Sequence, residues 1–337
     1  MKDFYKYTEQ IDELIKLANP TEQDLKRLFG IISDDNELAI YFYRENTNGE
    51  WLFLLNKSGV FGELQDSGKT NELLTRMKAH FLVEIVEQKP KEVIEIISKI
   101  DVEDIIIQGI FLKAILKRPL DVVDEGISLI KKYLEKDGYN IDWYAIGMQS
   151  AEFMTAISEK YPDKAFEIAQ ILLELRSPQK NEDYLDDIKS RFEKHDYEDL
   201  IFEHYKKLWE IDAFKSSTLL INIFNNYLEE LPKDDHRVKT GFNIVIERLD
   251  IIKEGYSRET TRAIIQGICE SGKFVIEKQP EKTGKLLDYL ENLKKIIFKR
   301  IEMFLIRFVP DGTQKERINS IISNKKFLDK SFYEKEN

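Results

Sequence analysis

The chain has 337 residues and a formal net charge of -11, with 42% hydrophobic and 34% charged residues. This mixture is too apolar for a disordered chain and too evenly charged for a membrane protein. The negative charge argues against non-specific binding to nucleic acid, because such binding depends on neutralising phosphates. A single cysteine, Cys269, excludes an internal disulfide and any multi-cysteine metal site, and it favours a reducing cytoplasm.

The first twenty residues are charged throughout and lack the apolar core of a signal peptide. No window reaches the roughly 18–20 apolar residues that a membrane span needs. We therefore expect a cytoplasmic protein that has no membrane partner.

The N-terminal part of the chain predicts short helices with clear boundaries. The first helix is expected over residues 2–17. Thr21 and Asp24 have the spacing of a capping box at the start of a second helix, and Gly30 predicts where that helix ends. A further short helix is expected over residues 51–57.

Residues 36–68 are rich in aromatic side chains at helix-like spacing. A cluster of this kind must be buried or must bind something. We predict that this cluster is an N-terminal cap, which covers the apolar face of the first repeat, and that Trp51 is largely buried. An exposed Trp51 would instead make this stretch the leading candidate for a partner site. The predicted structural cluster consists of Tyr41, Phe42, Trp51, Leu55, Gly59 and Phe61.

The order of Y-F-Y, W-L-x-L-L and G-V-F over residues 41–61 resembles the helical-repeat regions of large, mostly uncharacterised bacterial proteins. In those proteins the pattern precedes HEAT-like helical hairpins. Some of them look like sensor or scaffold parts of anti-phage defence systems, joined to an NTPase or effector module. The resemblance implies a scaffold role, although no effector module is visible in this sequence.

From residue 71 the chain changes to longer amphipathic segments that alternate with helices expected to start at Pro90, Pro119 and Pro162, with a looser echo at Pro280. The spacing of these prolines is irregular. Scarce glycine and proline also favour helix. The sequence therefore predicts an all-α fold, an irregular HEAT-like solenoid of stacked helical hairpins in which each unit buries its apolar face on its neighbours.

Three regions are expected: an N-terminal helical cap with the aromatic cluster over residues 1–70, a helical-repeat array over 71–310, and a short helix with a polar tail over 311–337. The acidic segment 177–199 is interpreted as a hinge or a long connection within the array. Within the array, further helices are expected over residues 141–160, 200–211, 216–230, 237–253, 260–277 and 281–308.

Residues 62–70 resemble a P-loop, but one residue too many separates the two glycines and Glu63 occupies the first position of the loop. The ordinary interpretation is a helix N-terminus capped near Thr70. Ser271 to Lys273 lacks the flanking spacing altogether. Neither segment predicts a nucleotide site, and no cofactor is expected.

The four histidines, His80, His195, His204 and His236, form no H-E-x-x-H motif. His195 and His204 do not have the i, i+4 spacing that shares a metal, so a metal site would need long-range assembly. We interpret all four as surface or packing residues and Cys269 as a buried free thiol. No metal and no catalytic residue are predicted.

The segment 286–309 interleaves basic residues with phenylalanines. It could lie on a membrane surface or cover a partner groove. The more ordinary interpretation is a closing helix of the solenoid whose basic residues lie in water. Its candidate partner-binding residues are Lys294, Lys295, Lys299, Arg300 and Arg307.

These observations favour a non-enzymatic helical-repeat scaffold or adapter that binds a protein partner. The first alternative is an adapter that docks on nucleic acid or a nucleoprotein through the basic C-terminal helix, since residues 281–337 carry more basic than acidic side chains. The second is an enzyme with a dispersed active site.

Overall fold

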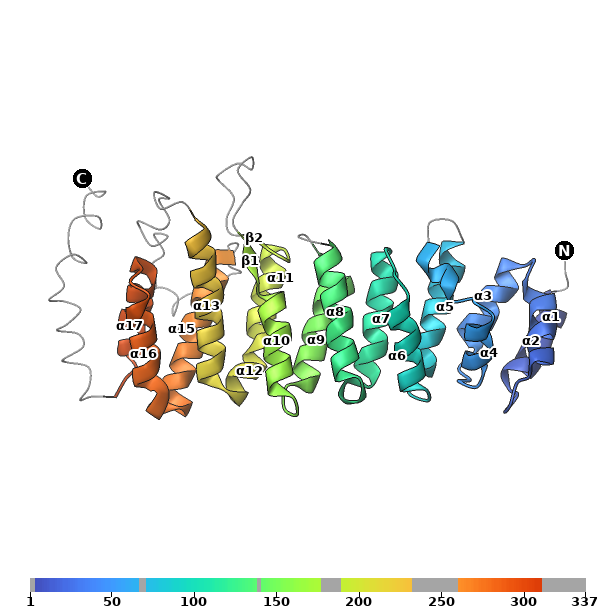
Figure 1. Cartoon of the computed structure of the whole chain (residues 1–337), viewed down its shortest axis with the longest axis horizontal. Coiled ribbons are helices and arrows are strands. Elements are labelled where there is room, and N and C mark those ends of the chain that lie inside the picture. The colour runs from blue at the N-terminus through green and yellow to red at the C-terminus, as the bar shows by residue number, and fades with distance from the viewer. Residues whose placement is uncertain (1–3, 67–70, 138–140, 177–188, 232–259, 311–337) are drawn as a thin grey trace. The chain divides into compact units, whose positions relative to one another are not determined.

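The computed structural model describes residues 4–66, 71–137, 141–176, 189–231 and 260–310 (Figure 1). The chain divides into two compact units, Met1–Lys160 and Tyr161–Asn337, and each is considered by itself. The described residues are almost entirely helical, which confirms the predicted all-α fold. The predicted boundary after residue 70 falls inside the first unit, and the segment 177–199 falls inside the second.

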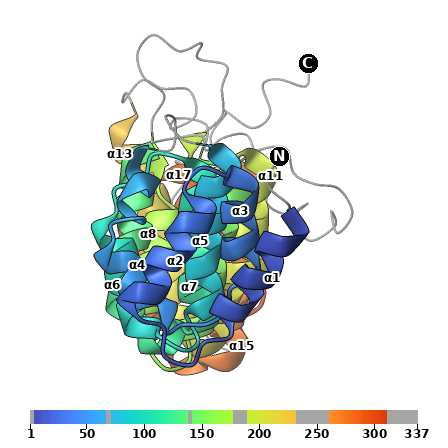
Figure 2. The same ribbon diagram turned by 90° about the vertical axis from the view of Figure 1, so that its right-hand side faces the viewer.

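The first unit consists of two rows of helices (Figures 1 and 2). One row contains α1, α3, α5, α7 and α9, which pack against one another in succession; in the other row α2 contacts α4, and α6 contacts α8. Successive helices thus alternate between the rows. The elements are α1 (Phe4–Ile15), α2 (Glu22–Ile32), α3 (Asn36–Glu45), α4 (Trp51–Lys57), η1 (Gly62–Asp66), α5 (Glu72–Ile85), α6 (Pro90–Lys99), α7 (Ile105–Lys117), η2 (Pro119–Asp121), α8 (Val123–Asp137), η3 (Trp143–Gly147) and α9 (Met148–Ile157).

Capping side chains set the helix starts in this unit. The Thr21 side chain accepts a hydrogen bond from the backbone N–H of Asp24, and the Asp24 carboxylate accepts one from the backbone N–H of Thr21, so the predicted capping box is confirmed. Asn71, Asp104 and Asp142 cap α5, α7 and η3 in the same way, with side-chain oxygens that accept backbone N–H groups.

Two expectations about helix boundaries in the first unit were wrong. Gly30 does not end α2, which continues to Ile32 because Ile31 and Ile32 are buried against the rest of the unit. Pro119 starts only a 3₁₀ turn, and the helix α8 begins at Val123.

The aromatic cluster forms the core between α3, α4 and α5. Trp51 is fully buried, as predicted, and its ring lies edge-on to Phe42 at 5.6 Å between ring centroids. Phe61 stacks on Phe81 at 6.2 Å. Gly59 has φ of 82°, a conformation that glycine adopts without strain, and it turns the chain after α4 so that Phe61 returns to the core. The cluster is therefore a structural core that also includes Phe81 of α5.

In the second unit α13, α15 and α17 pack in succession, with α10 and α12 against α13 and α16 against α15 and α17. A short antiparallel ladder pairs Leu175 with Ser190, and the sequence did not predict it. The elements are α10 (Pro162–Leu172), β1 (Leu175–Arg176), β2 (Lys189–Ser190), α11 (Lys194–Asp199), η4 (Leu200–Tyr205), α12 (Lys206–Ile211), α13 (Ala213–Glu230), α15 (Thr260–Lys278), η7 (Pro280–Lys282), α16 (Thr283–Asn292) and α17 (Ile296–Ile306).

The long helix expected over residues 281–308 does not exist as one element. Pro280 opens a 3₁₀ turn, and the chain breaks between α16 and α17 at Lys294, whose φ is 54°. The break folds α17 back against α16. The helices expected over 141–160 and 200–211 each contain a π-helical segment, η3 and η4. The helix expected over 237–253, most of the segment 177–199, and the tail 311–337 lie outside the described residues.

Candidate partner-binding groove

A groove of about 480 Å³ lies in the first unit between α4 with η1 on one side and α6 on the other. On the two sides of the groove, α4 has seven residues and α6 has ten. The residues that line the groove are Gly49, Glu50, Leu52, Phe53, Asn56, Phe61, Gly62, Gln65, Lys89, Glu92, Glu95, Ile96, Lys99 and Ile100.

One end of the groove is fixed by hydrogen bonds between the turn before α4 and the turn before α6. The Gln88 side chain accepts from the Gly49 backbone N–H at 3.0 Å and donates to the Thr47 carbonyl oxygen at 2.8 Å. Asn48 donates to the carbonyl oxygens of Ile15 and Leu17, which ties the same turn to α1. These bonds hold α4 at a set position relative to α6 without help from a ligand.

The floor of the groove is apolar and its wall carries one exposed aromatic ring. Leu52 on α4, Ile96 on α6 and Ile100 directly after α6 are buried, whereas Phe53 is 73% exposed. The other hydrophobic residues of the segment W-L-F-L-L point into the unit, so Phe53 alone in that segment turns outward. A phenylalanine in this position gains by contact with another molecule.

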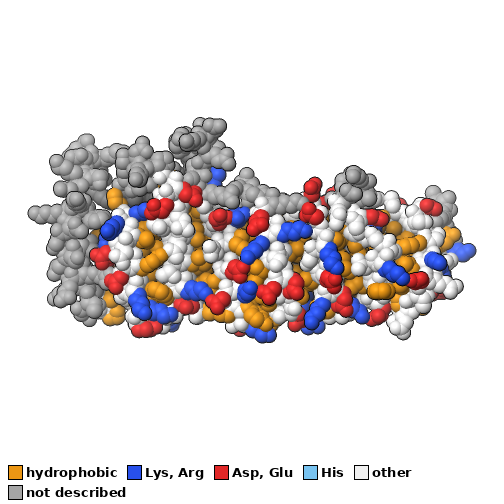
Figure 3. Space-filling view, viewed as in Figure 1, with side chains coloured by type: hydrophobic (Ala, Val, Ile, Leu, Met, Phe, Trp, Pro, Cys, Tyr) orange, Lys and Arg blue, Asp and Glu red, His pale blue; other side chains and the backbone are white. Residues whose placement is uncertain are grey.

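The charged residues at the rim neutralise one another. Lys89 Nζ lies 2.9 Å from Glu50 Oε1, and Lys99 Nζ lies 2.6 Å from Glu95 Oε1. The hydrogen bond to Glu50 and its negative charge raise the pKa of Lys89, and the hydrogen bond from Lys99 and its positive charge lower the pKa of Glu95. Glu92 adds a further carboxylate. Figure 3 shows the same intermixing of acidic and basic side chains over this face of the first unit.

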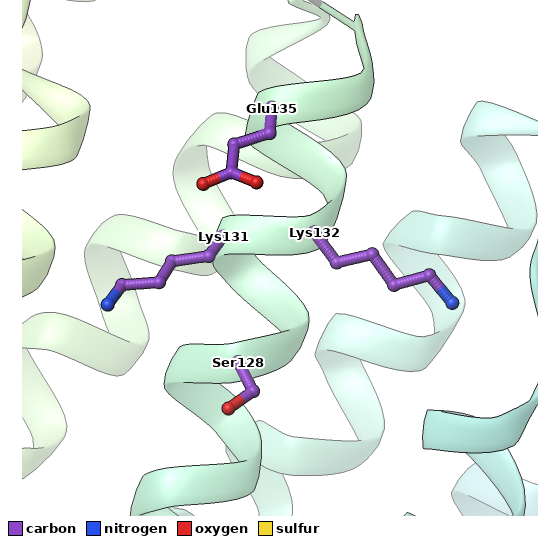
Figure 4. A pocket seen from close by; sticks show the side chains of 4 residues that line it. All are labelled: Ser128, Lys131, Lys132 and Glu135. Atoms are coloured by element: carbon purple, nitrogen blue, oxygen red, sulfur yellow. The ribbon is translucent and has the colours of Figure 1, made fainter.

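A shallower depression on α8 has a different character (Figure 4). It is lined by Ser128, Lys131, Lys132 and Glu135, and the two lysine side chains extend in opposite directions from the helix. Lys132 donates to the Ile100 carbonyl oxygen at 3.0 Å and lies 3.5 Å from Asp101 Oδ1. These side chains do not converge on a common point. The depression therefore has no group of side chains that could bind one ligand together.

The predicted basic residues of the C-terminal helix are scattered rather than gathered into one stripe. Lys294 is exposed at the break between α16 and α17. Lys295 Nζ lies 2.7 Å from Asn225 Oδ1 and also pairs with Glu229 on α13.

Lys299 is buried, contrary to the expectation that it lies in water. Its Nζ lies 3.0 Å from Glu302 Oε2, and Glu302 is itself fully buried; Glu291 Oε1 lies 3.6 Å away. Arg300 is half-buried on the same helix. The Arg307 guanidinium lies 5.7 Å from the centre of the Phe304 ring. Lys295 and Lys299 therefore make their contacts inside the second unit.

Among the described residues, one group of side chains in the second unit combines a glutamate, a histidine and an aspartate, all of which can bind a metal ion. Glu193, His195 and Asp196 offer ligand atoms that all lie within 4.8 Å of one another, and His195 Nε2 is 3.1 Å from Asp196 Oδ1. These are the residues of the described chain that could hold a cation. Sequence reasoning missed them because it searched for paired histidines, although the run E-K-H-D contains all three ligand types.

The remaining candidate residues occupy ordinary structural positions. Cys269 is buried in α15, as predicted. Ser271 and Gly272 also lie inside that helix, so no phosphate loop forms there. His80 faces outward from α5, and partial desolvation and the nearby charge of Lys113 lower its pKa.

No protein-family model, curated protein or solved structure matches this chain. Within the described ranges, no helix is both long and apolar enough to cross a membrane. The site must therefore be interpreted from its own geometry.

Proposed function

We propose that the protein is a non-enzymatic helical-repeat scaffold that binds a protein partner in the groove between α4 and α6. The observation that carries this proposal is Phe53, which is 73% exposed above an apolar floor on a helix whose other hydrophobic residues are buried. Exposed aromatic residues next to a pocket are typical energetic centres of protein interfaces. The groove accepts an apolar side chain of the partner, which packs on Phe53.

The rim of the groove supports a protein partner over a small charged ligand. Lys89 and Lys99 are each paired with a carboxylate, so their charges are compensated before anything binds. A polar rim around an apolar centre is the usual composition of a transient protein interface. A phosphorylated or carboxylated ligand would have to displace these ion pairs first.

The scaffold proposal also includes the setting that the aromatic segment implies. Its resemblance to helical-repeat regions of bacterial proteins makes a cytoplasmic role in a bacterial defence system, with a separately encoded effector as the partner, the first setting to test. The packing of α1, α3, α5, α7 and α9 in succession supports a repeat architecture for the first unit.

Docking on nucleic acid through the C-terminal helix is less well supported. Binding to phosphates requires lysines and arginines that can exchange their present partners for the nucleic acid. Lys299 is buried beside Glu302, and Lys295 is held by Asn225 and Glu229. Of the predicted stripe, Lys294 and Arg307 are exposed.

The test is capture of the partner from the native host with three forms of the full chain: wild type, Phe53→Ser and Tyr5→Ser. Phe53→Ser removes a contact worth about 1.5–3 kcal/mol, so the affinity should fall roughly tenfold or more. Tyr5 is also highly exposed but lies on α1, away from the groove. The proposal fails if the same protein is retained equally by the wild type and Phe53→Ser, or if Tyr5→Ser loses it as well.

A further inference from the structure

Exposed apolar side chains occupy the same position at the start of three helical segments in the first unit. Leu73, Ile106 and Tyr144 are each the second residue of their element, in α5, α7 and η3, and each follows a capping Asn or Asp by two residues. They are 52%, 42% and 70% exposed. The first turn of a helix normally favours acidic side chains, and the equivalent residue of α3 is indeed Glu37.

Contacts between α5 and α7 indicate that Leu73 and Ile106 lie at matching heights on the two helices. Glu84 on α5 and Lys117 on α7 form an ion pair at 3.6 Å, and Leu73 and Ile106 lie the same number of residues before them. His80 and Lys113, which interact electrostatically, fit the same register. The starts of α5, α7 and η3 lie along one edge of the first unit, the upper edge in Figure 1.

The contact between α7 and η3 is equally close. A Cβ atom added at Gly109 would lie 2.7 Å from the Ala145 carbonyl oxygen, so the two backbones approach each other directly beside Ile106 and Tyr144. Neighbouring packed helices lie about 8–10 Å apart. Leu73, Ile106 and Tyr144 lie on three neighbouring elements, and we expect about this spacing between them. We call these three residues the edge column.

Acidic side chains border the edge column. Glu103 and Asp142 are exposed, and Asp104 is half-buried. A helix N-terminus carries only about half of a positive charge, so each capping carboxylate leaves its helix end negative. Arg76, a cation on the first turns of these elements, is already paired with Glu72.

We infer that the edge column is a second docking surface, which binds an amphipathic basic helix of a partner protein. A helix rises 1.5 Å per residue, so apolar residues at i, i+7 and i+14 recur about every 10 Å and match the column. Lysines and arginines beside them meet the bordering carboxylates. The groove beside Phe53 lies between helices of the other row, so the two surfaces are distinct.

The test uses synthetic helical peptides and the full chain, with binding followed by fluorescence anisotropy. The probe is a lysine-rich peptide of about 18 residues with leucine at i, i+7 and i+14. Its twin carries glutamate in place of lysine. The wild-type chain should bind the lysine peptide at least about tenfold more tightly than the twin, and added salt should weaken this binding.

The variant Leu73→Ser/Ile106→Ser/Tyr144→Ser should lose about tenfold or more in affinity for the lysine peptide. The matched control, Phe4→Ser/Tyr5→Ser/Leu120→Ser, removes equally many exposed hydrophobic side chains from the same unit and should bind normally. Circular dichroism of both variants checks that they fold. The inference is overturned if the wild type binds neither peptide, binds both equally, or if the control loses as much affinity as the column variant. Phe53 is unchanged in both variants, so the difference between them does not depend on the groove.

Discussion

Two interior regions of this protein exclude water by different physical means. In the first unit, the core between α3, α4 and α5 is built from aromatic rings around Trp51 and Phe42. In the second unit, α16 and α17 enclose the ion pair of Lys299 and Glu302, with Glu291 nearby. The first region is stabilised by apolar burial, whereas the second has to offset the desolvation of two charges.

The difference determines how each region tolerates change. An aromatic core loses stability in proportion to the volume removed. A buried ion pair contributes little net stability, but the loss of one member leaves the other charge buried and uncompensated. The first region should therefore respond to size and the second to charge balance.

The largest effect is expected from Trp51→Ala. Removal of the buried indole should lower the free energy of unfolding by about 3–5 kcal/mol, measured by urea denaturation followed by circular dichroism. The control is Phe53→Ala on the same helix, where the exposed ring should change stability by no more than about 0.5 kcal/mol. Equal losses in the two variants would show that Trp51 is not the core residue described here.

Lys299→Met tests the second region. It leaves Glu302 buried without its lysine and should cost about 3 kcal/mol. The double variant Lys299→Met/Glu302→Met should recover much of this loss, because no unpaired charge remains. The exposed neighbour Lys294→Met serves as the control and should be near neutral. The contrary outcome is a double variant whose loss in the free energy of unfolding equals the sum of the losses of Lys299→Met and Glu302→Met. The two side chains would then not be coupled, and the two regions would not differ in the way described above.

Lys294→Gly should have a smaller effect of opposite sign. Lys294 has φ of 54°, a left-handed conformation that costs a non-glycine residue about 1 kcal/mol. Glycine relieves this strain, so the variant should gain up to about 1 kcal/mol in the free energy of unfolding. Thermal melting of wild type and variant measures the gain. A loss of stability would mean that the side chain contributes more than its backbone strain costs.

The smallest expected effect is the pH dependence of the stability that the capping box of Thr21 and Asp24 gives to the first unit. The hydrogen bonds from Thr21 lower the pKa of Asp24 below its ordinary value of 3.8. Because the folded pKa is depressed, this contribution to stability is present above about pH 4 and is lost as the pH falls through the folded pKa.

Thr21→Ala should therefore lower the melting temperature at neutral pH, and the difference from wild type should narrow as the pH falls through the folded pKa of Asp24. Melting curves over this pH range check the prediction. A gap that stays constant with pH would argue that Asp24 does not take part in the capping box.

Several elements could be predicted from local sequence because their causes are local. The capping box of Thr21 and Asp24 and the short helix α4 both follow from side chains within one or two turns. The burial of Trp51 followed from the density of apolar residues around it. Gly30 was misjudged because the packing of Ile31 and Ile32 outweighs the helix-breaking tendency of one glycine.

The candidate surfaces were less predictable. The groove is lined by residues of α4, η1 and α6, which only the tertiary structure brings together. Phe53 could not be distinguished from its buried neighbours until the direction of α4 was known. The break at Lys294 has no glycine or proline to mark it, so a continuous helix was the natural expectation over residues 281–308.

By itself, the sequence determined the all-α fold, many helix boundaries and the aromatic core, since helical periodicity and capping are properties of neighbouring residues. Only the tertiary structure decided that Lys299 pairs with Glu302 in the interior and that Leu73, Ile106 and Tyr144 align along one edge. The physical reason is that the ion pair and the alignment both depend on which helices contact one another. These contacts are set by packing between segments that are far apart in the chain.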